Sequence, residues 1–169
     1  MRRFTLVIVI LLAAIRLLGS ELINEYHMII DTVYSESLQE SRMIAVYLPP
    51  DFDEKKTYPV IFATDGQLLD SVYKISLDSL IEKGHLPELI MIGAFSNEKK
   101  VEGSDYEYRN CEYIKGWGED RVLKKRFDNH FVFFTEELVK YVEQKYPISR
   151  ERKYRYFYGC SNGAGFGVT

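Results

Sequence analysis

The sequence YRYFYGCSNGAG, residues 154–165, joins a run of strand-forming aromatic residues to the pattern Gly-x-Ser-x-Gly. The pattern alone matches many ordinary loops, but directly after a strand it indicates a sharp turn into a helix with a serine at its tip. Gly159 and Gly163 give room on either side of Ser161, and we expect Gly165 to let the new helix pack closely on the strand. The stretch therefore predicts a nucleophile elbow whose serine hydroxyl points out of the bend.

The length and composition are those of one ordinary folded domain. With 169 residues the chain can bury a useful core, although it is short for an α/β enzyme built around such an elbow. A net charge of −3 gives no reason to expect a nucleic-acid partner. The thirteen tyrosines suit surfaces that handle carbohydrate or aryl esters, but on amphipathic strands half-buried packing is the favoured explanation.

The start of the sequence has the pattern of a signal peptide. Met1-Arg2-Arg3 is a positive n-region, residues 4–15 are apolar, and residues 18–20 form a small-residue cleavage site. The apolar run is too short to span a bilayer comfortably, and Arg16 interrupts it. We expect residues 1–20 to direct export and to be removed; an uncleaved membrane anchor is the alternative.

Cys111 and Cys160 are the only cysteines in the sequence. Export would permit a disulfide between them. Because a bridge at Cys160 would constrain the predicted elbow, we expect two free, mostly buried thiols instead.

The part that follows the signal peptide predicts an antiparallel hairpin. Residues 26–33 and 42–48 are strand-like runs, and a polar turn region at 35–41 separates them. Pro49 and Pro50 then end the second strand, because proline lacks a backbone donor and restricts the residue before it.

Two short apolar runs without polar alternation, residues 58–64 and 89–94, predict strands buried on both faces. Between them, residues 68–83 have apolar side chains at helical spacing, and Gly84 provides a stop. The order strand, helix, strand favours a parallel crossover. The apolar positions of this helix are Leu69, Val72, Tyr73, Leu77, Leu80 and Ile81.

Residues 97–126 are irregular, with several glycines, many charges and the single tryptophan, Trp117. They predict an excursion over the surface near the elbow. Helical periodicity returns at residues 127–145, and the elbow strand comes next. The apolar face of that helix is expected to contain Phe131, Phe134, Leu138, Tyr141 and Val142.

An ordered series of short motifs resembles the putative-esterase group of α/β-hydrolases, which contains esterase D, enterochelin esterases and feruloyl esterases. Each motif alone is weak, but together they follow the family's order and cover nearly all of residues 21–169. The matching pieces are Arg42 with Val46-Tyr47-Leu48-Pro49-Pro50, Tyr58-Pro59-Val60, Asp65-Gly66-Gln67, Arg109 followed by Glu112-Tyr113, and Gly159-Cys160-Ser161-Asn162-Gly163.

The resemblance implies an α/β-hydrolase sheet with an N-terminal antiparallel hairpin, parallel strands and flanking helices. It also implies a serine hydrolase in which Ser161 attacks an ester carbonyl once a histidine takes its proton. The backbone N–H of Asn162, just past the nucleophile, would be one donor to the oxyanion. We place the second donor at the backbone N–H of Gln67, where Gly66 allows the approach.

Four further residues are candidates for the substrate pocket: Asp65, Gly66, Arg109 and Tyr113. The resemblance suggests this, because the Arg-x-x-Glu-Tyr region of similar proteins lies near the pocket. Two plainer interpretations remain open. Asp65-Gly66 is also an ordinary turn pair, and Arg109 with Glu112 can form a surface ion pair that contributes under about 1 kcal/mol.

The acid and the histidine of an α/β-hydrolase follow the serine in the chain. Here His27, His85 and His130 all precede Ser161, so chain order favours structural or surface roles for them. The strands beyond the elbow strand would also follow it, and without them an apolar sheet edge lies open. We therefore expect residues 21–169 to be the N-terminal portion of a longer hydrolase domain, truncated after the elbow and inactive alone.

The sequence thus favours an exported serine esterase that acts on small-molecule or polysaccharide-linked carboxylic esters. We expect no metal or organic cofactor, no nucleic-acid partner and no stable membrane insertion after signal cleavage. Two alternatives remain. The absent base and the many tyrosines suit a non-catalytic carbohydrate-binding or interaction module, and an acyl-enzyme captured by an alcohol would make the protein an acyltransferase. The identity of the ester stays open.

Overall fold

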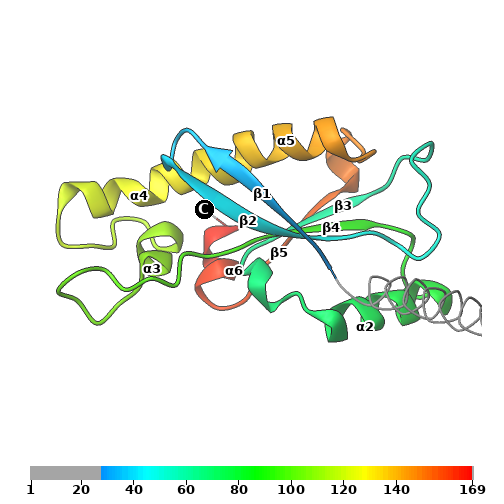
Figure 1. The fold of residues 1–169 in the computed structure, drawn as a ribbon, viewed down its shortest axis with the longest axis horizontal. Coiled ribbons are helices and arrows are strands. Elements are labelled where there is room, and N and C mark those ends of the chain that lie inside the picture. The colour runs from blue at the N-terminus through cyan, green and yellow to red at the C-terminus, as the bar shows by residue number, and fades with distance from the viewer. Residues whose placement is uncertain (1–27, 169) are drawn as a thin grey trace, which may run out of the picture.

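The computed structural model describes residues 28–168, which form a five-stranded mixed sheet with helices on both faces (Figure 1). The strands occur across the sheet in the order β1-β2-β4-β3-β5. Their bounds are β1 Ile29–Ser35, β2 Glu40–Tyr47, β3 Val60–Ala63, β4 Ile90–Ala94 and β5 Arg155–Tyr158. The predicted signal peptide, residues 1–20, lies outside the described residues.

The hairpin that the sequence predicts is formed by β1 and β2, which pair antiparallel with Ile29 opposite Val46. The first strand runs on to Ser35, past its predicted end, because the Ser35 side chain is buried and bonded. Its hydroxyl donates to Glu137 Oε2 over 2.6 Å and accepts from the Leu38 N–H over 3.0 Å. The polar turn is thus fastened to a helix on one face of the sheet.

The three strands at the other side of the sheet are parallel. Val60 of β3 lies opposite Ile90 of β4 and opposite Arg155 of β5. The predicted crossover from β3 to β4 is therefore present. Because parallel strands end at the same edge, the loops after β3, β4 and β5 meet there, and this edge is where α/β proteins place their ligands.

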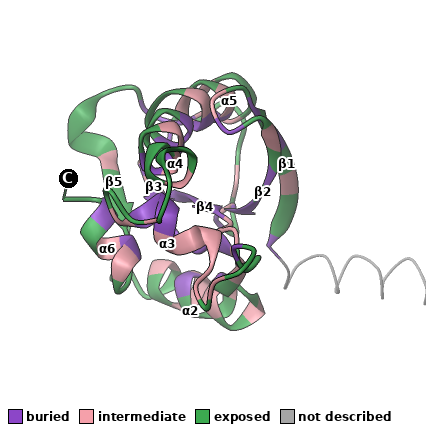
Figure 2. Cartoon of the chain, turned by 90° about the vertical axis from the view of Figure 1, so that its left-hand side faces the viewer, coloured by how far each residue is buried: buried purple, intermediate pink, exposed green. Residues whose placement is uncertain are grey.

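Helix α2 (Ser71–Glu82) connects β3 to β4 and covers one face of the sheet (Figures 1 and 2). Asp70 caps it by accepting the N–H of Tyr73, and Gly84 follows its end with a φ of 70°. Only a narrow stripe of the helix faces the sheet, and Leu77 is its buried residue. The expectation of an apolar face that includes Val72 and Leu80 was therefore too wide, because both are exposed.

A long helix covers the opposite face: α4 (Arg121–Val132), a π-helical turn (Phe133–Glu137) and α5 (Leu138–Lys145) follow one another directly. It begins at Arg121 and not at residue 127, because Asp120 caps it by accepting the N–H groups of Val122 and Leu123. The side chains buried along it belong to Phe127, His130, Phe133, Phe134, Leu138 and Val142.

The predicted apolar face of this helix is wrong at one residue. Phe131 is 42% exposed, whereas its neighbour His130 is completely buried. Packing against the sheet sets the rotation of the helix about its axis. At this rotation the His130 imidazole faces the core and the Phe131 ring faces the solvent.

Two short helices lie at the carboxyl edge of the sheet, α3 (Tyr108–Tyr113) and α6 (Asn162–Phe166) (Figure 2). The rings of Tyr113 and Phe166 are 5.7 Å apart between centroids, so the two helices are in contact. Segment 97–126 was expected to be a surface excursion. Its α3 portion instead enters the core, where Cys111, Glu112 and Tyr113 are buried.

The buried Glu112 carboxylate joins three elements of the fold. It is fully inaccessible, and it pairs with Arg42 of β2 and with Arg126 of α4. Arg42 Nη1 lies 3.1 Å from Glu112 Oε2, and Arg126 Nε lies 2.8 Å from Oε1. Both guanidinium groups also contact Glu40, so two arginines and two carboxylates form one compact network.

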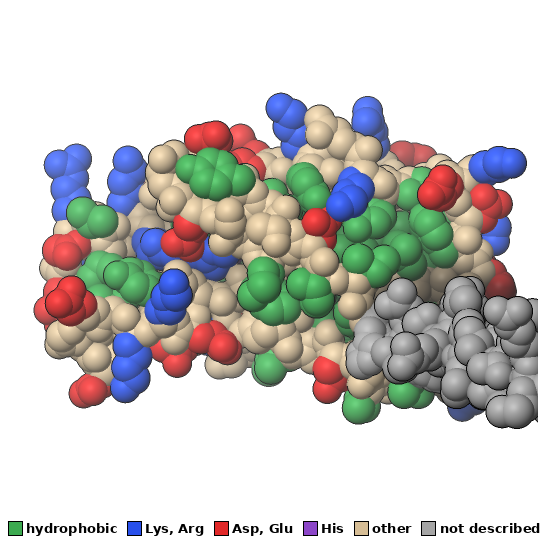
Figure 3. All heavy atoms as spheres, in the orientation of Figure 1, with side chains coloured by type: hydrophobic (Ala, Val, Ile, Leu, Met, Phe, Trp, Pro, Cys, Tyr) green, Lys and Arg blue, Asp and Glu red, His purple; other side chains and the backbone are tan. Residues whose placement is uncertain are grey.

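Strand β5 forms one edge of the sheet, and β3 is its only partner among residues 28–168. Both sides of this edge carry exposed rings, Tyr156 and Tyr158 on one side and Phe157 on the other. Elsewhere, on the face in Figure 3, hydrophobic side chains form separate patches among charged groups of both signs. Within the described part of the chain, no helix is long and apolar enough to cross a bilayer.

Glu112→Ala is expected to lower the free energy of unfolding by about 3–5 kcal/mol, because it leaves two arginines without their buried counter-charge. Urea denaturation followed by circular dichroism measures the change. Glu88→Ala is the matched control, since Glu88 pairs with Lys56 at a distance of 3.0 Å on the solvated surface. Equal effects of the two substitutions would contradict a structural role for the buried network.

Candidate active site

The predicted strand–turn–helix is present around Ser161. β5 ends at Tyr158, α6 begins at Asn162, and Ser161 lies exposed between them with φ 54° and ψ −127°. A non-glycine residue with positive φ is strained by about 1–3 kcal/mol, and such strain persists only where the surroundings enforce it. The turn is closed by the Gly163 N–H, which donates to the Cys160 carbonyl over 2.9 Å.

Two glycines enforce this geometry by close packing. A Cβ on Gly159 would lie 2.7 Å from the carbonyl group of Gly163. A Cβ on Gly163 would lie closer than 3.0 Å to the Thr64 hydroxyl and 3.1 Å from Asp65 Oδ2. The first turn of α6 therefore abuts the loop after β3.

Gly165 does not have the packing role that we expected from the sequence. A Cβ there would meet nothing within 4 Å, so the residue lies in open space. Gly167 packs closely instead, because a Cβ on it would collide with the Phe157 ring. The close contact with strand β5 is thus made by Gly167, just after α6, and not by Gly165 as the motif suggested.

Several backbone N–H groups in this region have no acceptor within the described part of the chain, among them those of Asn162 and Gln67; the N–H groups of Gly66, Cys160 and Ser161 also have none. Asn162 is the first residue of α6, and Gln67 lies in the 3₁₀ turn Gly66–Leu68 directly after β3. Donors that protein groups leave open at a strained serine are suited to an oxyanion. The sequence singled out Asn162 and Gln67 among these groups, and their role as oxyanion donors stays a prediction.

The loop that carries Gln67 is fixed against β4. A Cβ on Gly66 would lie closer than 3.0 Å to the carbonyl group of Gly93, so only glycine fits. The Gln67 side chain extends the contact: Nε2 donates to Ser96 Oγ over 2.6 Å and to Glu98 Oε1 over 2.8 Å. Its Oε1 accepts the N–H of Ser96 over 3.1 Å.

Helix α3 also holds this loop, through Asp65. Asp65 is buried with φ 56° and ψ 44°, and both of its carboxylate oxygens accept from Arg109, Oδ1 from Nε over 2.6 Å and Oδ2 from Nη2 over 2.7 Å. The Asp65 N–H donates to the Tyr113 hydroxyl over 3.3 Å. The alternative of a surface ion pair between Arg109 and Glu112 is wrong, because each has a different partner and Glu112 is buried.

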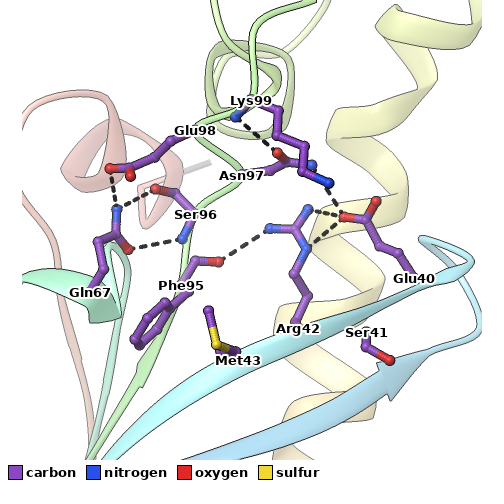
Figure 4. A pocket seen from close by; sticks show the side chains of 10 residues that line it. All are labelled: Glu40, Ser41, Arg42, Met43, Gln67, Phe95, Ser96, Asn97, Glu98 and Lys99. Carbon is purple, nitrogen blue, oxygen red and sulfur yellow. Dashed lines mark hydrogen bonds and ion pairs between the residues drawn. The ribbon is translucent and has the colours of Figure 1, made fainter.

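A cavity of about 560 Å³ with both polar and apolar lining opens beside this loop (Figure 4). Gln67 lines it together with side chains from β2 and from the segment after β4. Phe95 and Met43 give it an apolar portion, and Glu40 and Lys99 contribute charge. Among the site residues predicted from the sequence, only Gln67 lines this cavity. The sequence analysis did not predict the cavity itself.

None of the histidines occupies the position of a base in the described structure. His130 is completely buried, and neither ring nitrogen has a hydrogen-bond partner among residues 28–168. Burial, with the nearby charges of Arg42 and Arg126, holds its pKa well below the usual value. His85 is exposed in the turn after α2, and His27 lies outside the described residues.

The two cysteines are free, as expected, but they differ in exposure. Cys111 is buried in α3, and burial raises the pKa of its thiol. Cys160 is exposed at the tip of the elbow, so the expectation of two buried thiols is wrong for it. The strained turn thus leaves Cys160 exposed together with Ser161, whereas Asn162 is partly buried. Residues 28–168 contain no group of three or more histidine, cysteine, aspartate or glutamate side chains arranged for a metal ion.

Comparison with known proteins identifies the family of the chain. A family model described as putative esterase matches residues 35–168. The chain belongs to the putative esterase family. The resemblance that the sequence motifs suggested is thereby confirmed. The uncharacterized protein YjcH of Bacillus subtilis (strain 168) is 27% identical over 133 residues, which cover 78% of this chain and 50% of that protein.

Solved structures with the same fold include two esterases. One is the ferulic acid esterase AmCE1/Fae1A from Anaeromyces mucronatus, solved in complex with ferulic acid, with 23% identity and a TM-score of 0.60 over 82% of this chain and 50% of that chain. The other is the enterobactin esterase FES from Shigella flexneri, with 15% identity and a TM-score of 0.63 over 83% of this chain and 32% of that chain. The predicted α/β-hydrolase fold class is confirmed, and the chain spans half or less of these proteins.

Gly163→Ala is expected to lower the free energy of unfolding by about 1–3 kcal/mol, because its Cβ would be forced against Thr64. Gly165→Ala is the matched control in the same helix, and it should be neutral or should stabilise by up to about 1 kcal/mol. Urea denaturation of both variants measures the difference. A Gly163→Ala protein as stable as the Gly165→Ala protein would show that the close packing does not hold the elbow.

His130 should make the protein less stable as the pH falls. Because its folded-state pKa is lowered, the unfolded chain binds the additional proton below its pKa of about 6.5, and stability falls there by up to about 1.4 kcal/mol per pH unit. His130→Leu should remove this part of the loss between pH 7 and pH 5, and the control His85→Ala should retain it. Urea midpoints at several pH values measure it; identical profiles for wild type and His130→Leu would contradict the assignment.

Proposed function

We propose that the protein is an exported serine esterase that hydrolyses carboxylic esters through an acyl-enzyme on Ser161. The observation that carries the proposal is the strained, exposed Ser161 in a chain of the putative esterase family, with open backbone N–H groups at Asn162 in the same turn and at Gln67 in the loop after the neighbouring strand β3. A hydroxyl on such a turn is free to reach a substrate, and the strain fixes its direction.

The reaction has two halves. Ser161 Oγ forms a bond to the ester carbonyl carbon and gives its proton to a general base, which passes the proton to the departing alcohol. Water then attacks the acyl-enzyme, the carboxylic acid leaves, and the serine recovers its proton. The N–H groups of Asn162 and Gln67 would stabilise the oxyanion in both halves, and the loss of one such donor costs about 3–4 kcal/mol of transition-state stabilisation.

We place the general base and its acid partner outside the described residues. His130 cannot take the role, because it is buried among aromatic rings and its pKa is lowered. No histidine, aspartate or glutamate occurs between Asn162 and Thr169. In the family's order the base and the acid follow the serine, and this chain spans about half of the curated relative that it matches.

The cavity beside Gln67 supports a substrate with both polar and apolar portions. Phe95 and Met43 offer contact to a ring or chain, and the polar groups around them suit hydroxyls or charges. The two esterases with the same fold are named for ferulic acid and enterobactin. Aryl esters and esters of phenolic siderophores are therefore the first substrates to test, together with esters linked to polysaccharides.

Ser161 in the full-length protein should react with a fluorophosphonate probe, and Ser161→Ala should not. Mass spectrometry of the labelled peptide identifies the site, and the N-terminus of the same sample shows whether residues 1–20 have been removed on export. Hydrolysis of feruloyl and acetyl esters should depend on the same residue. A full-length protein that neither labels at Ser161 nor cleaves an ester, but binds carbohydrate, would replace the proposal with the binding-module alternative.

An acyltransferase would give the same labelling. Product analysis with an ester and a competing alcohol separates the two: free acid supports hydrolysis, whereas transfer to the alcohol as the main product would overturn it.

A further inference from the structure

We propose that Arg109 and Tyr113 are positioning residues for the oxyanion donor of Gln67. They act through Asp65, whose backbone and carboxylate they fix, and they touch neither the substrate nor the reacting atoms. The inference deepens the proposed function and rests on it.

Asp65 has a conformation that needs support from outside the loop. Its φ of 56° and ψ of 44° lie in the left-handed region, which costs a non-glycine residue energy, although aspartate tolerates it better than most. Its carboxylate is also buried, and a buried charge is costly unless it is paired. The contacts that stabilise Asp65 in this conformation therefore determine the positions of the following residues, Gly66 and Gln67.

Both supports come from one face of α3. Arg109 and Tyr113 are four residues apart, so their side chains lie on the same side of the helix. The Arg109 guanidinium binds both carboxylate oxygens of Asp65 and lies 4.8 Å from the centre of the Tyr113 ring. The Tyr113 hydroxyl accepts the Asp65 N–H. Rotation of the backbone at Asp65 would break one or both supports.

Helix α3 is itself firmly attached. Glu112, between the two positioning residues, is paired with Arg42 and Arg126 in the core. The Arg109 N–H donates to the Asn97 carbonyl over 2.8 Å. A bidentate arginine on a rigid base can hold its partner within the small tolerance that catalysis requires.

The contact with β4 does not make this clamp redundant. Gly66 against Gly93 and the Gln67 side chain against Ser96 restrain the loop on its β4 side only. Asp65 precedes that contact in the chain, and α3 restrains it separately through Arg109 and Tyr113. Loss of the clamp should therefore loosen the Gln67 N–H without unfolding the loop.

The test uses the full-length protein with Arg109→Ala, Arg109→Lys and Asp65→Asn, assayed on an ester that the wild type cleaves. Asparagine keeps the preference for left-handed backbone but loses the charge. We expect kcat to fall about 10²-fold with KM within about threefold, since a small misplacement costs that much in a preorganised site. The affinity for a boronic acid, which mimics the tetrahedral state at Ser161, should fall in parallel.

Arg155→Ala is the matched control. Arg155 is a half-buried arginine paired with Glu143, but it stands at the start of β5, at the opposite end of the strand from the elbow. It should keep wild-type kcat and boronate affinity. Millimolar guanidinium should restore part of the kcat of Arg109→Ala, which a general loss of folding would not permit.

Each outcome decides the matter. Arg109→Lys and Asp65→Asn proteins that fold with wild-type kcat and boronate affinity would overturn the positioning role while Ser161 labelling still stood. Equal losses in Arg155→Ala, or no rescue by guanidinium, would assign Arg109 to stability alone. A wild-type protein without ester cleavage or labelling would overturn the proposed function, and the inference would fall with it.

Discussion

The fold depends on the need of one buried carboxylate for positive partners. Glu112 lies in the core without access to water, and a charge there is tolerated only where its partners surround it. Those partners come from β2 and α4, so one pairing places α3 relative to the sheet and to the long helix. Everything that α3 carries, including Arg109 and Tyr113, takes its position from that requirement.

The candidate site combines local strain with rigid surroundings. Ser161 and Asp65 both have positive φ, and they stand in loops that follow neighbouring parallel strands. Strain of this kind persists only where neighbours enforce it, and here the neighbours are glycine backbones on one side and an arginine clamp on the other. The sheet brings the two loops to one edge, and the loops carry the candidate nucleophile and oxyanion donors.

Features that depend on neighbours in the sequence could be predicted, and features that depend on distant partners could not. The turn at Ser161 follows from small residues beside a strand, and that pattern is complete within 154–165. The burial of Glu112 depends on Arg42, far away in the chain, so no local pattern reveals it. The burial of His130 where Phe131 was predicted has the same origin, because contacts with distant parts of the chain set the rotation of the helix. The cavity beside Gln67 likewise arises from three separate segments.

The contact between Gly66 and Gly93 also limits how the protein can change over time. A Cβ on Gly66 would collide with the Gly93 carbonyl group, a Cβ on Gly93 would collide with the Leu69 side chain and with the Gly66 Cα, and every amino-acid replacement of glycine adds a Cβ. No single substitution at either position is therefore a neutral step, and a change at one does not make room at the other. Evolution or engineering that reshapes this site must therefore change the surrounding loops, because the contact between the turn after β3 and strand β4 stays fixed.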